Sequence, residues 1–253
     1  MSVRGLDRFR AYFRPHADDY MLIGGTACAV LFDHLGVGFR STRDFDVLVV
    51  ADGDRAFLQT LSAFIRDGAY QRHVDARGRQ RCFRFTDPSD ASWPSKLEVC
   101  ARRSITDDEA RQYFPLVRPA DGADLVSLSA ILFDDAYVQW LAGGADVVDG
   151  VRVARLEYLL PLKALAWKNL SAARDRGEAV DGDDIRKHKL DCFRLINRIP
   201  PALHVTLPDI IAADVTAFIA AMEAEMPGLP PDLSATLPIY LRAMRMLYGL
   251  TPS

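Results

Sequence analysis

The sequence has few cysteines and no long apolar run, and each of these absences argues against a class of protein. Only four cysteines occur in 253 residues and no two of them form a C-x-x-C pair, so their spacing indicates neither a disulfide framework nor a zinc site. No apolar segment approaches the roughly 20 residues that cross a membrane, and the N-terminal residues lack the apolar core of a signal peptide. We therefore expect a cytoplasmic protein without a membrane partner, with cysteines that are small buried residues.

A strong net charge is absent as well. The chain has 31 lysine and arginine residues against 34 aspartate and glutamate residues, which gives a formal net charge of −3. This balance argues against a protein that coats nucleic acid, although it is compatible with a local basic patch. The hydrophobic content of 49% is typical of a globular chain, and the length allows one large domain or two small ones.

The first half of a candidate site is a glycine turn at the start of a helix. An apolar strand at residues 20–23 leads directly into Gly24 and Gly25, which permit φ > 0 and a close approach of another molecule to the backbone. Thr26 is placed to cap a helix over residues 27–35 and to leave amide donors pointing forward. The turn is therefore a suitable place for a phosphate group.

The second half is a strand that opens with two aspartates, Asp44 and Asp46, ahead of the β-branched run 47–50. Residues two apart on a strand face the same side, so the two carboxylates should point together while Phe45 faces the core. Such a pair repels itself unless protons or cations neutralise it. Mg²⁺ binds carboxylate and phosphate oxygens, so the two halves together predict a site for a metal and a nucleoside triphosphate.

A third carboxylate, Glu98, lies in an apolar strand predicted over residues 96–101. A charged group in such a strand is costly unless it is satisfied. Either Glu98 completes the carboxylate site, or it forms a salt bridge with Lys96 or Arg102.

The character of the chain changes at residue 154, from mixed strands and helices to helices only. We predict an α+β fold with a first domain at residues 1–154 and an all-helical domain at residues 155–253. In the first domain, Asp-Gly at residues 149–150 predicts a β-hairpin. The second domain is predicted to contain helices over residues 156–176, 181–197, 207–226 and 232–248.

Two helices of the second domain carry further candidates. Lys163 has apolar neighbours on its helix, so its ammonium either reaches water or projects into a cleft to meet an anion. Asp184, His188 and Asp191 fall on one face of the next helix, at the spacing i, i+4 and i+7. One histidine between two acids on a helix is more often an ordinary polar surface than a metal site.

The order of these motifs resembles the nucleotidyltransferase superfamily that includes DNA polymerase β, and more closely its AbiEii branch of bacterial toxin-type enzymes. The later segments L-x-x-L-L-x-L-K-A-x-A at residues 156–166 and D-D-I-x-K-H-x-x-D at residues 183–191 resemble motifs of the same branch. The first motif, G-G-T followed by a helix and R-S-T-R-D-F-D, rests on Gly24, Gly25, Thr26, Arg40, Thr42, Asp44 and Asp46.

This resemblance implies a polymerase β-like nucleotidyltransferase domain followed by the helical domain. The implied activity is the Mg²⁺-dependent transfer of a nucleoside monophosphate from an NTP to an acceptor hydroxyl, with Mn²⁺ as an alternative metal. Glu98 departs from many relatives, which carry aspartate at its position. The implied metal ligands and catalytic acids are Asp44, Asp46 and Glu98, with Asp184 as the acid of the last motif, which either holds Lys163 or assists the acceptor. The implied nucleotide contacts are Gly24, Gly25, Thr26, Arg40, Thr42 and Lys163.

The resemblance also implies a toxin of a toxin–antitoxin pair, with a cognate antitoxin as partner and tRNA as acceptor. An arginine-rich hairpin is compatible with an RNA acceptor, because arginine suits bidentate contact with phosphate, but it is equally well a solvated hairpin. Transfer to a small molecule, as in aminoglycoside nucleotidyltransferases, transfer to a protein hydroxyl, and a non-catalytic nucleotide-binding protein remain open. The arginines of the hairpin are Arg72, Arg77, Arg79, Arg81 and Arg84.

Overall fold

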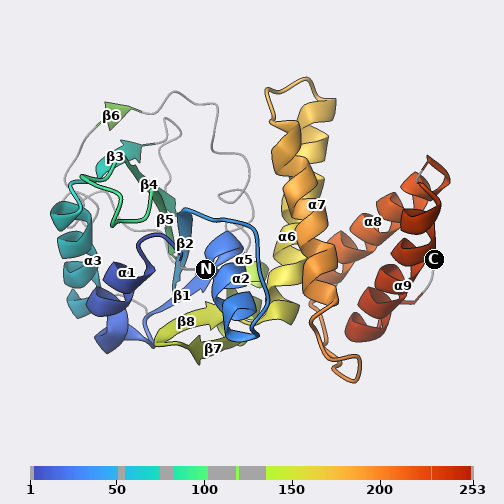
Figure 1. The fold of residues 1–253 in the computed structure, drawn as a ribbon, viewed down its shortest axis with the longest axis horizontal. Coiled ribbons are helices and arrows are strands. Elements are labelled where there is room, and N and C mark those ends of the chain that lie inside the picture. Colours follow the sequence, from blue (N-terminus) through green and yellow to red (C-terminus); the bar gives the residue numbers. More distant parts are fainter. Residues whose placement is uncertain are drawn as a thin grey trace. The chain divides into compact units, whose positions relative to one another are not determined.

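The chain divides into two compact units, with the division between Arg155 and Leu156. The structure is a computed structural model that describes residues 3–50, 55–74, 82–101, 118–119, 135–228 and 230–251. The first unit contains the β-sheet, and the described elements of the second unit are all helical (Figure 1).

The first unit is a mixed sheet with helices. Its strands are β1 (Tyr20–Ile23), β2 (Asp44–Val49), β3 (Gln71–Val74), β4 (Cys82–Thr86), β5 (Lys96–Ala101), β6 (Arg118–Pro119), β7 (Ala145–Val148) and β8 (Val151–Ala154). Its helices are α1 (Leu6–Phe13), the 3₁₀ turn η1 (Arg14–His16), α2 (Gly24–His34), α3 (Arg55–Asp67) and α5 (Asp135–Ala142). The described strands form one sheet in the order β6-β3-β4-β5-β2-β1-β8-β7. The α+β class predicted from the sequence is confirmed.

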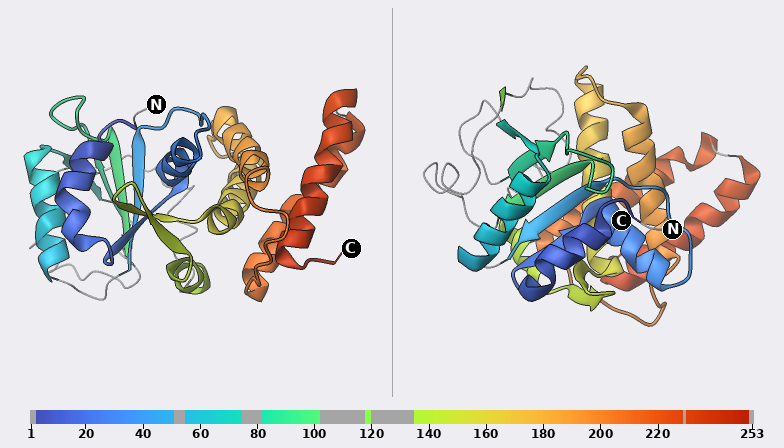
Figure 2. Two further views of the ribbon diagram at one scale, coloured as in Figure 1. Left: turned by 60° about the horizontal axis from the view of Figure 1, so that its bottom comes forward. Right: turned by 60° about the vertical axis from the view of Figure 1, so that its left-hand side comes forward.

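An aromatic core covers one face of this sheet. The rings of Phe9 on α1 and Phe45 on β2 lie 5.3 Å apart between centroids, and Phe9 also stacks on Phe13 at 4.4 Å. Helices α1 and α3 cover this face, and α2 lies on the opposite side (Figure 2). Phe45 is fully buried while Asp44 and Asp46 stay partly exposed, so the predicted alternation of β2 is confirmed.

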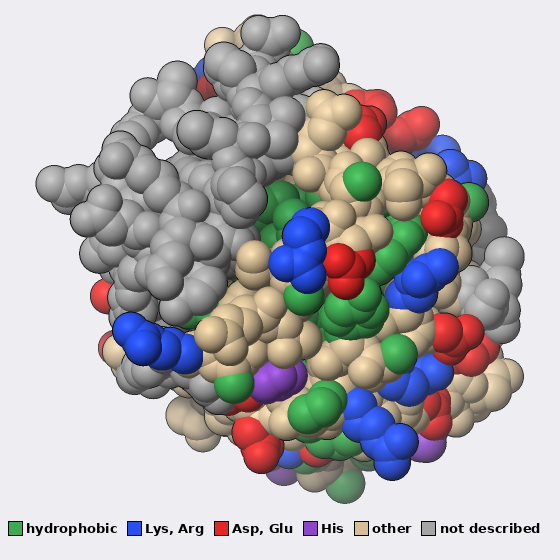
Figure 3. Space-filling view, turned by 90° about the vertical axis from the view of Figure 1, so that its left-hand side faces the viewer, with side chains coloured by type: hydrophobic (Ala, Val, Ile, Leu, Met, Phe, Trp, Pro, Cys, Tyr) green, Lys and Arg blue, Asp and Glu red, His purple; other side chains and the backbone are tan. Residues whose placement is uncertain are grey.

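The outer surface over α1 and α3 carries charges of both signs. Arg66 pairs with Asp67 at the end of α3, and the guanidinium of Arg8 on α1 lies 4.6 Å from the ring centre of Trp93. Figure 3 shows basic and acidic side chains interspersed over the described part of this face. A surface of mixed charge offers a polyanion little net attraction.

The hairpin of β7 and β8 follows the predicted turn chemistry. Asp149 and Gly150 both have positive φ, 49° and 78°, as a two-residue type I′ turn requires. β8 then pairs with β1 in parallel, so this hairpin extends the sheet from β1.

One cysteine departs from the expectation of four unpaired residues. Cys28 and Cys192 are buried thiols outside any disulfide, as predicted, but Cys100 on β5 is disulfide-bonded. The residue opposite Cys100 across the antiparallel pair of strands is Cys82 on β4. The linear spacing of the cysteines gives no sign of this bond, because only strand pairing brings distant residues opposite each other.

The second unit is a set of helices: α6 (Leu156–Asp175), α7 (Gly182–Ile196), α8 (Asp209–Glu225), the 3₁₀ turn η2 (Met226–Gly228) and α9 (Pro231–Tyr248). Helix α6 continues through Pro161. Asp181 caps α7 by accepting a hydrogen bond from the amide of Asp183 at 2.9 Å. Among the described helices, none has the length and apolar character that crossing a membrane requires.

Candidate active site

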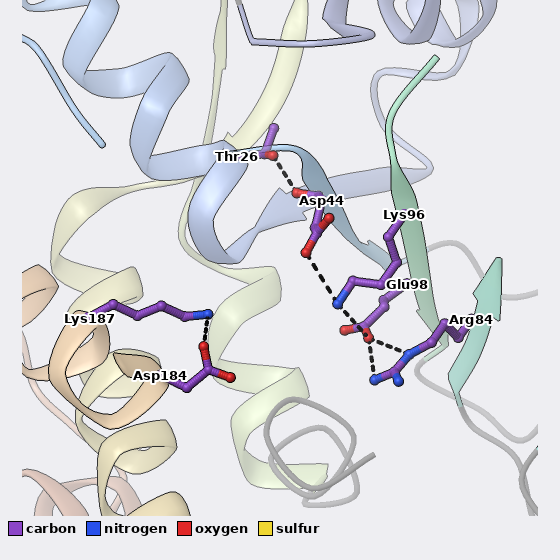
Figure 4. A network of polar contacts seen from close by, with 7 residues as sticks. All are labelled: Thr26, Asp44, Arg84, Lys96, Glu98, Asp184 and Lys187. Atoms are coloured by element: carbon purple, nitrogen blue, oxygen red, sulfur yellow. Dashed lines mark hydrogen bonds and ion pairs between the residues drawn. The ribbon is translucent and has the colours of Figure 1, made fainter. Parts of the chain in front are cut away.

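Five charged side chains lie on adjacent strands of the first unit. In the parallel register of β2 and β5, Asp44 is opposite Lys96 and Asp46 is opposite Glu98. In the antiparallel register of β4 and β5, Arg84 is opposite Glu98. Figure 4 shows Asp44, Lys96, Glu98 and Arg84 joined in one polar network. The predicted position of Glu98 next to the Asp44–Asp46 strand is therefore the observed one.

Two cations hold the Glu98 carboxylate, whose side chain is only 10% exposed. Arg84 donates from Nη2 and Nε to Oε1, at 2.6 and 2.8 Å, and the Lys96 ammonium lies 3.5 Å from the same oxygen. Burial alone would raise the pKa of Glu98, but Lys96 and Arg84, together with a hydrogen bond to Asp46, lower it overall. The predicted salt bridge with Lys96 is confirmed, and Arg102 lies outside the described residues.

Lys96 is a cation placed between carboxylates. Its Nζ lies 3.2 Å from Oδ2 of Asp44 and 3.5 Å from Oε1 of Glu98. Burial acts to lower the pKa of Lys96, but the neighbouring Glu98, Asp44 and Asp46 raise it above its ordinary value. The cluster of acids therefore stabilises a positive charge on this face of the sheet.

The glycine turn packs directly against these acids. Gly24 has a φ of +67°, and a Cβ atom built on it would lie 1.9 Å from Oδ2 of Asp46. A Cβ on Gly25 would meet Oγ1 of Thr42 at 2.9 Å and the guanidinium of Arg40 at 3.4 Å. The glycine turn and residues 40–46, which are separated by a helix in the sequence motif, are thus neighbours in the first unit.

Thr26 has a different role from the one predicted. Helix α2 begins at Gly24, Ile23 is its N-cap, and no side chain caps its amides. Thr26 is inside the first turn and donates its hydroxyl to the backbone oxygen of Asp44 at 2.6 Å, which ties α2 to β2. The predicted cap is therefore wrong. Because first-turn amides lack intrahelical acceptors, this buried helix start has donors that suit an anion.

A pocket of about 320 Å³ adjoins the glycine turn within the first unit. Arg40 and Thr42, which lie against Gly25, also line this pocket. The rest of the lining comes from Val3, from α2 and from the loop at residues 36–41. Arg40 and Thr42, two of the predicted nucleotide contacts, therefore lie between the glycine turn and this pocket.

Most of the arginine-rich hairpin is outside the described part of the chain. Arg77, Arg79 and Arg81 are not among the described residues, and neither is the side chain of Arg72. The remaining member, Arg84, binds Glu98, so it is a partner of the acidic cluster. Along β4, Arg84 points to the face of the sheet away from the buried Phe83 and Phe85. Only the register of β4 and β5 identifies Glu98 as the partner of Arg84.

The candidates of the second unit are paired among themselves. Lys163, 4% exposed, lies 3.3 Å from Oδ2 of the fully buried Asp191. Asp184 pairs with Lys187 one turn along α7. Of the two roles predicted for Asp184, holding Lys163 is wrong, since Asp191 is the acid that does so, and assisting the acceptor stays a prediction. His188 is buried on the same helix face, which does not fit an ordinary exposed polar surface.

The acidic cluster contains carboxylate donors of the kind that bind a metal ion. Within the described ranges, no group of three or more His, Cys, Asp or Glu side chains is arranged to hold a metal. The chemistry of the donors still fits one: Asp44 and Asp46 share a face, and a bound Mg²⁺ commonly takes one or two carboxylates plus phosphate oxygens. The Lys96 ammonium already stands against the Asp44 carboxylate, which shows that the position accepts positive charge.

Comparison of the chain with known protein families, curated proteins and solved structures gives no match.

Gly24 should be the least replaceable residue of the turn. Alanine at Gly24 has to adopt a left-handed φ and also displace the Asp46 carboxylate, so we expect a loss of about 2–4 kcal/mol in the free energy of unfolding. Gly36 is a matched control, since its φ is +69° with nothing within 4 Å of a built Cβ. Chemical denaturation of G24A and G36A separates the cost of the left-handed φ from the cost of displacing the Asp46 carboxylate. Equal losses of unfolding free energy in the two variants would rule out a cost from the contact with Asp46.

Proposed function

We propose that this chain is a metal-dependent nucleotidyltransferase that moves a nucleoside monophosphate from an NTP to an acceptor hydroxyl. The supporting observation is the close packing of the glycine turn on the acidic cluster, with Gly24 against Oδ2 of Asp46. An uncapped helix start suits phosphate, and paired aspartates suit a divalent cation. Their direct contact favours one site for both. Sequence resemblance to the polymerase β-like superfamily and its AbiEii branch points to the same chemistry.

Asp44 and Asp46 would hold the Mg²⁺ or Mn²⁺ ion. When bound, the ion would supply positive charge to the entering and leaving oxygens of the transfer. Arg84 and Lys96 would hold the Glu98 carboxylate beside Asp46, which is its neighbour across β2 and β5. Among the three proposed acids, Asp44 has a side chain that is 47% exposed, so it is accessible to an incoming phosphate.

The other residues of the first unit would position the triphosphate. The amides at Gly24 and Gly25 would donate to its terminal phosphates, and Arg40 would add a charge-assisted contact. The acceptor oxygen then forms a bond to the α-phosphorus while the bond from that phosphorus to the bridging oxygen breaks. Pyrophosphate leaves, and the proton of the acceptor hydroxyl passes to a carboxylate of the cluster.

For the acceptor we propose tRNA, with the protein acting as the toxin of a toxin–antitoxin pair. This part rests on the AbiEii resemblance alone. The observed bond between Arg84 and Glu98 removes one arginine from the predicted RNA-binding rim. Protein and small-molecule hydroxyls are therefore acceptors that the same experiment must include.

The test is incubation of the purified full chain with each α-³²P-labelled NTP, Mg²⁺ and total bacterial RNA. We expect label in a tRNA-sized band, and its loss when EDTA removes the metal. Parallel reactions with bacterial protein extract and with an aminoglycoside identify the other acceptors. Label on protein or drug keeps the transferase and replaces tRNA as acceptor. If every reaction stays unlabelled although the NTP binds, the chain is a nucleotide-binding protein and the transferase proposal fails.

A further inference from the structure

The second unit contains a pocket of its own, of about 470 Å³, lined by residues of α6, α7, α8 and α9. Its size lies in the range of small-molecule sites, which are typically about 300–1,000 Å³. None of the site residues considered above lines it. A binding function of this pocket would therefore be additional to the proposed transfer.

Three aromatic side chains give the pocket flat, half-buried walls. Trp167 comes from α6, Phe193 from α7 and Tyr240 from α9. The rings of Phe193 and Tyr240 stack with their centroids 5.7 Å apart and an angle of 23° between their planes. Partly exposed aromatic faces of this kind stack with nucleobases, with a gain of about 1–3 kcal/mol per base.

The same pocket is lined by three basic side chains, those of Arg174, Arg186 and Lys189. Arg186 is exposed and takes part in no ion pair within the described ranges. The carboxylate nearest to Arg174 is that of Asp175, at 4.0 Å. Lys189, in contrast, is paired with Glu225. Arg186 is therefore available for an anion, and Arg174 adds a second cation whose pair with Asp175 is long and exposed. Arginine binds phosphate in a bidentate manner.

The lining also contains a buried hydroxyl group, that of Ser171. The Oγ atom of Ser171 on α6 is inaccessible to solvent and makes no hydrogen bond with any described residue. Ser171 lines the same pocket as Trp167 and Arg174. Buried polar atoms are normally paired, so an unpaired hydroxyl at a pocket wall is consistent with a polar ligand group as its partner.

We propose that this pocket binds a nucleotide, with its base against the aromatic walls and its phosphate at Arg186 and Arg174. The Ser171 hydroxyl supplies a further hydrogen bond to the base or the sugar when its side chain rotates toward the pocket. The ligand is a free nucleoside monophosphate or one nucleotide of a single-stranded RNA, because both present the same base and phosphate. The proposal does not depend on the transferase activity, since binding here needs neither the acidic cluster nor a metal.

The test is isothermal titration calorimetry of the full chain in EDTA with each nucleoside 5′-monophosphate, the matching nucleoside, inorganic phosphate and a short single-stranded RNA. We expect a monophosphate or the RNA to bind more tightly than nucleoside or phosphate alone. R186Q and Y240L should each weaken this binding about tenfold or more. R198Q is the matched control, since Arg198 is an exposed arginine of the same unit outside the pocket, and it should leave binding unchanged.

The outcomes separate the sources of the ligand and the alternatives. Binding of the RNA without the free monophosphates identifies RNA as the source, and binding of monophosphates identifies a free nucleotide. Nucleosides that bind as tightly as their monophosphates, or binding unaffected by both R186Q and Y240L, overturn the proposal. So does the absence of binding by every probe. None of these results alters the transfer assay, so failure here and failure of the proposed function are distinguishable.

Discussion

Replacing Asp46 with asparagine should abolish nucleotide transfer while leaving the stability of the chain unchanged or slightly higher. Asp46 shares its side of the sheet with Asp44 and lies opposite Glu98 in the register of β2 and β5. Asparagine keeps the size and the hydrogen-bonding capacity but removes one negative charge from a crowded acidic cluster, so repulsion falls. The same charge is needed for a divalent cation and its phosphates, and we expect a loss of transfer of about 10³-fold or more.

The measurement pairs the labelled-NTP assay with thermal denaturation of the same protein. E98Q is the structural counterpart, because it deprives Arg84 and Lys96 of their shared carboxylate and should lower the melting temperature. D146N is the neutral control, since Asp146 is exposed on β7. Full metal-dependent activity in D46N would remove Asp46 from the site. Destabilisation of D46N as large as that of E98Q would assign Asp46 a structural role.

Replacing Asp191 with asparagine should lower the free energy of unfolding by about 3–5 kcal/mol, because it leaves a buried cation without its counter-charge. Lys163 is 4% exposed and lies 3.3 Å from the fully buried Asp191. Asp191 also accepts from Arg194 at 3.2 Å, but Arg194 is 41% exposed and can turn to water. The loss should therefore come mainly from Lys163.

Two variants test this assignment by chemical denaturation. Asp184 on the same helix pairs with Lys187, and both side chains are about 40% exposed, so D184N should cost only about 0–1 kcal/mol. The double variant K163M/D191L replaces the buried pair by apolar groups and should recover most of the stability that D191N loses. An equal cost for D184N and D191N would contradict the burial argument. A double variant no more stable than D191N would show that Asp191 acts through other contacts.

Local patterns in the sequence were enough to predict several features of both units. The alternation Asp44-Phe45-Asp46 predicted which side chain is buried, because the pleat of a strand fixes opposite faces for neighbouring residues. The Asp149-Gly150 turn followed from the backbone preferences of these two residues. The α+β class followed from the predicted elements, which change from mixed strands and helices to helices only near residue 154.

Contacts between distant residues were decided by the tertiary structure. Strand register makes Arg84 the partner of Glu98 and brings Cys100 opposite Cys82, and no spacing along the chain encodes a register. Packing between helices likewise selects Asp191 as the partner of Lys163, whereas the acid that the sequence resemblance offered for this lysine was Asp184. The partner of Thr26 also depends on tertiary packing, because its hydroxyl reaches the backbone oxygen of Asp44 only when α2 packs on β2. The sequence by itself thus determined which groups are present and which way each faces locally, whereas the pairing of those groups depends on three-dimensional distances that only the folded chain sets.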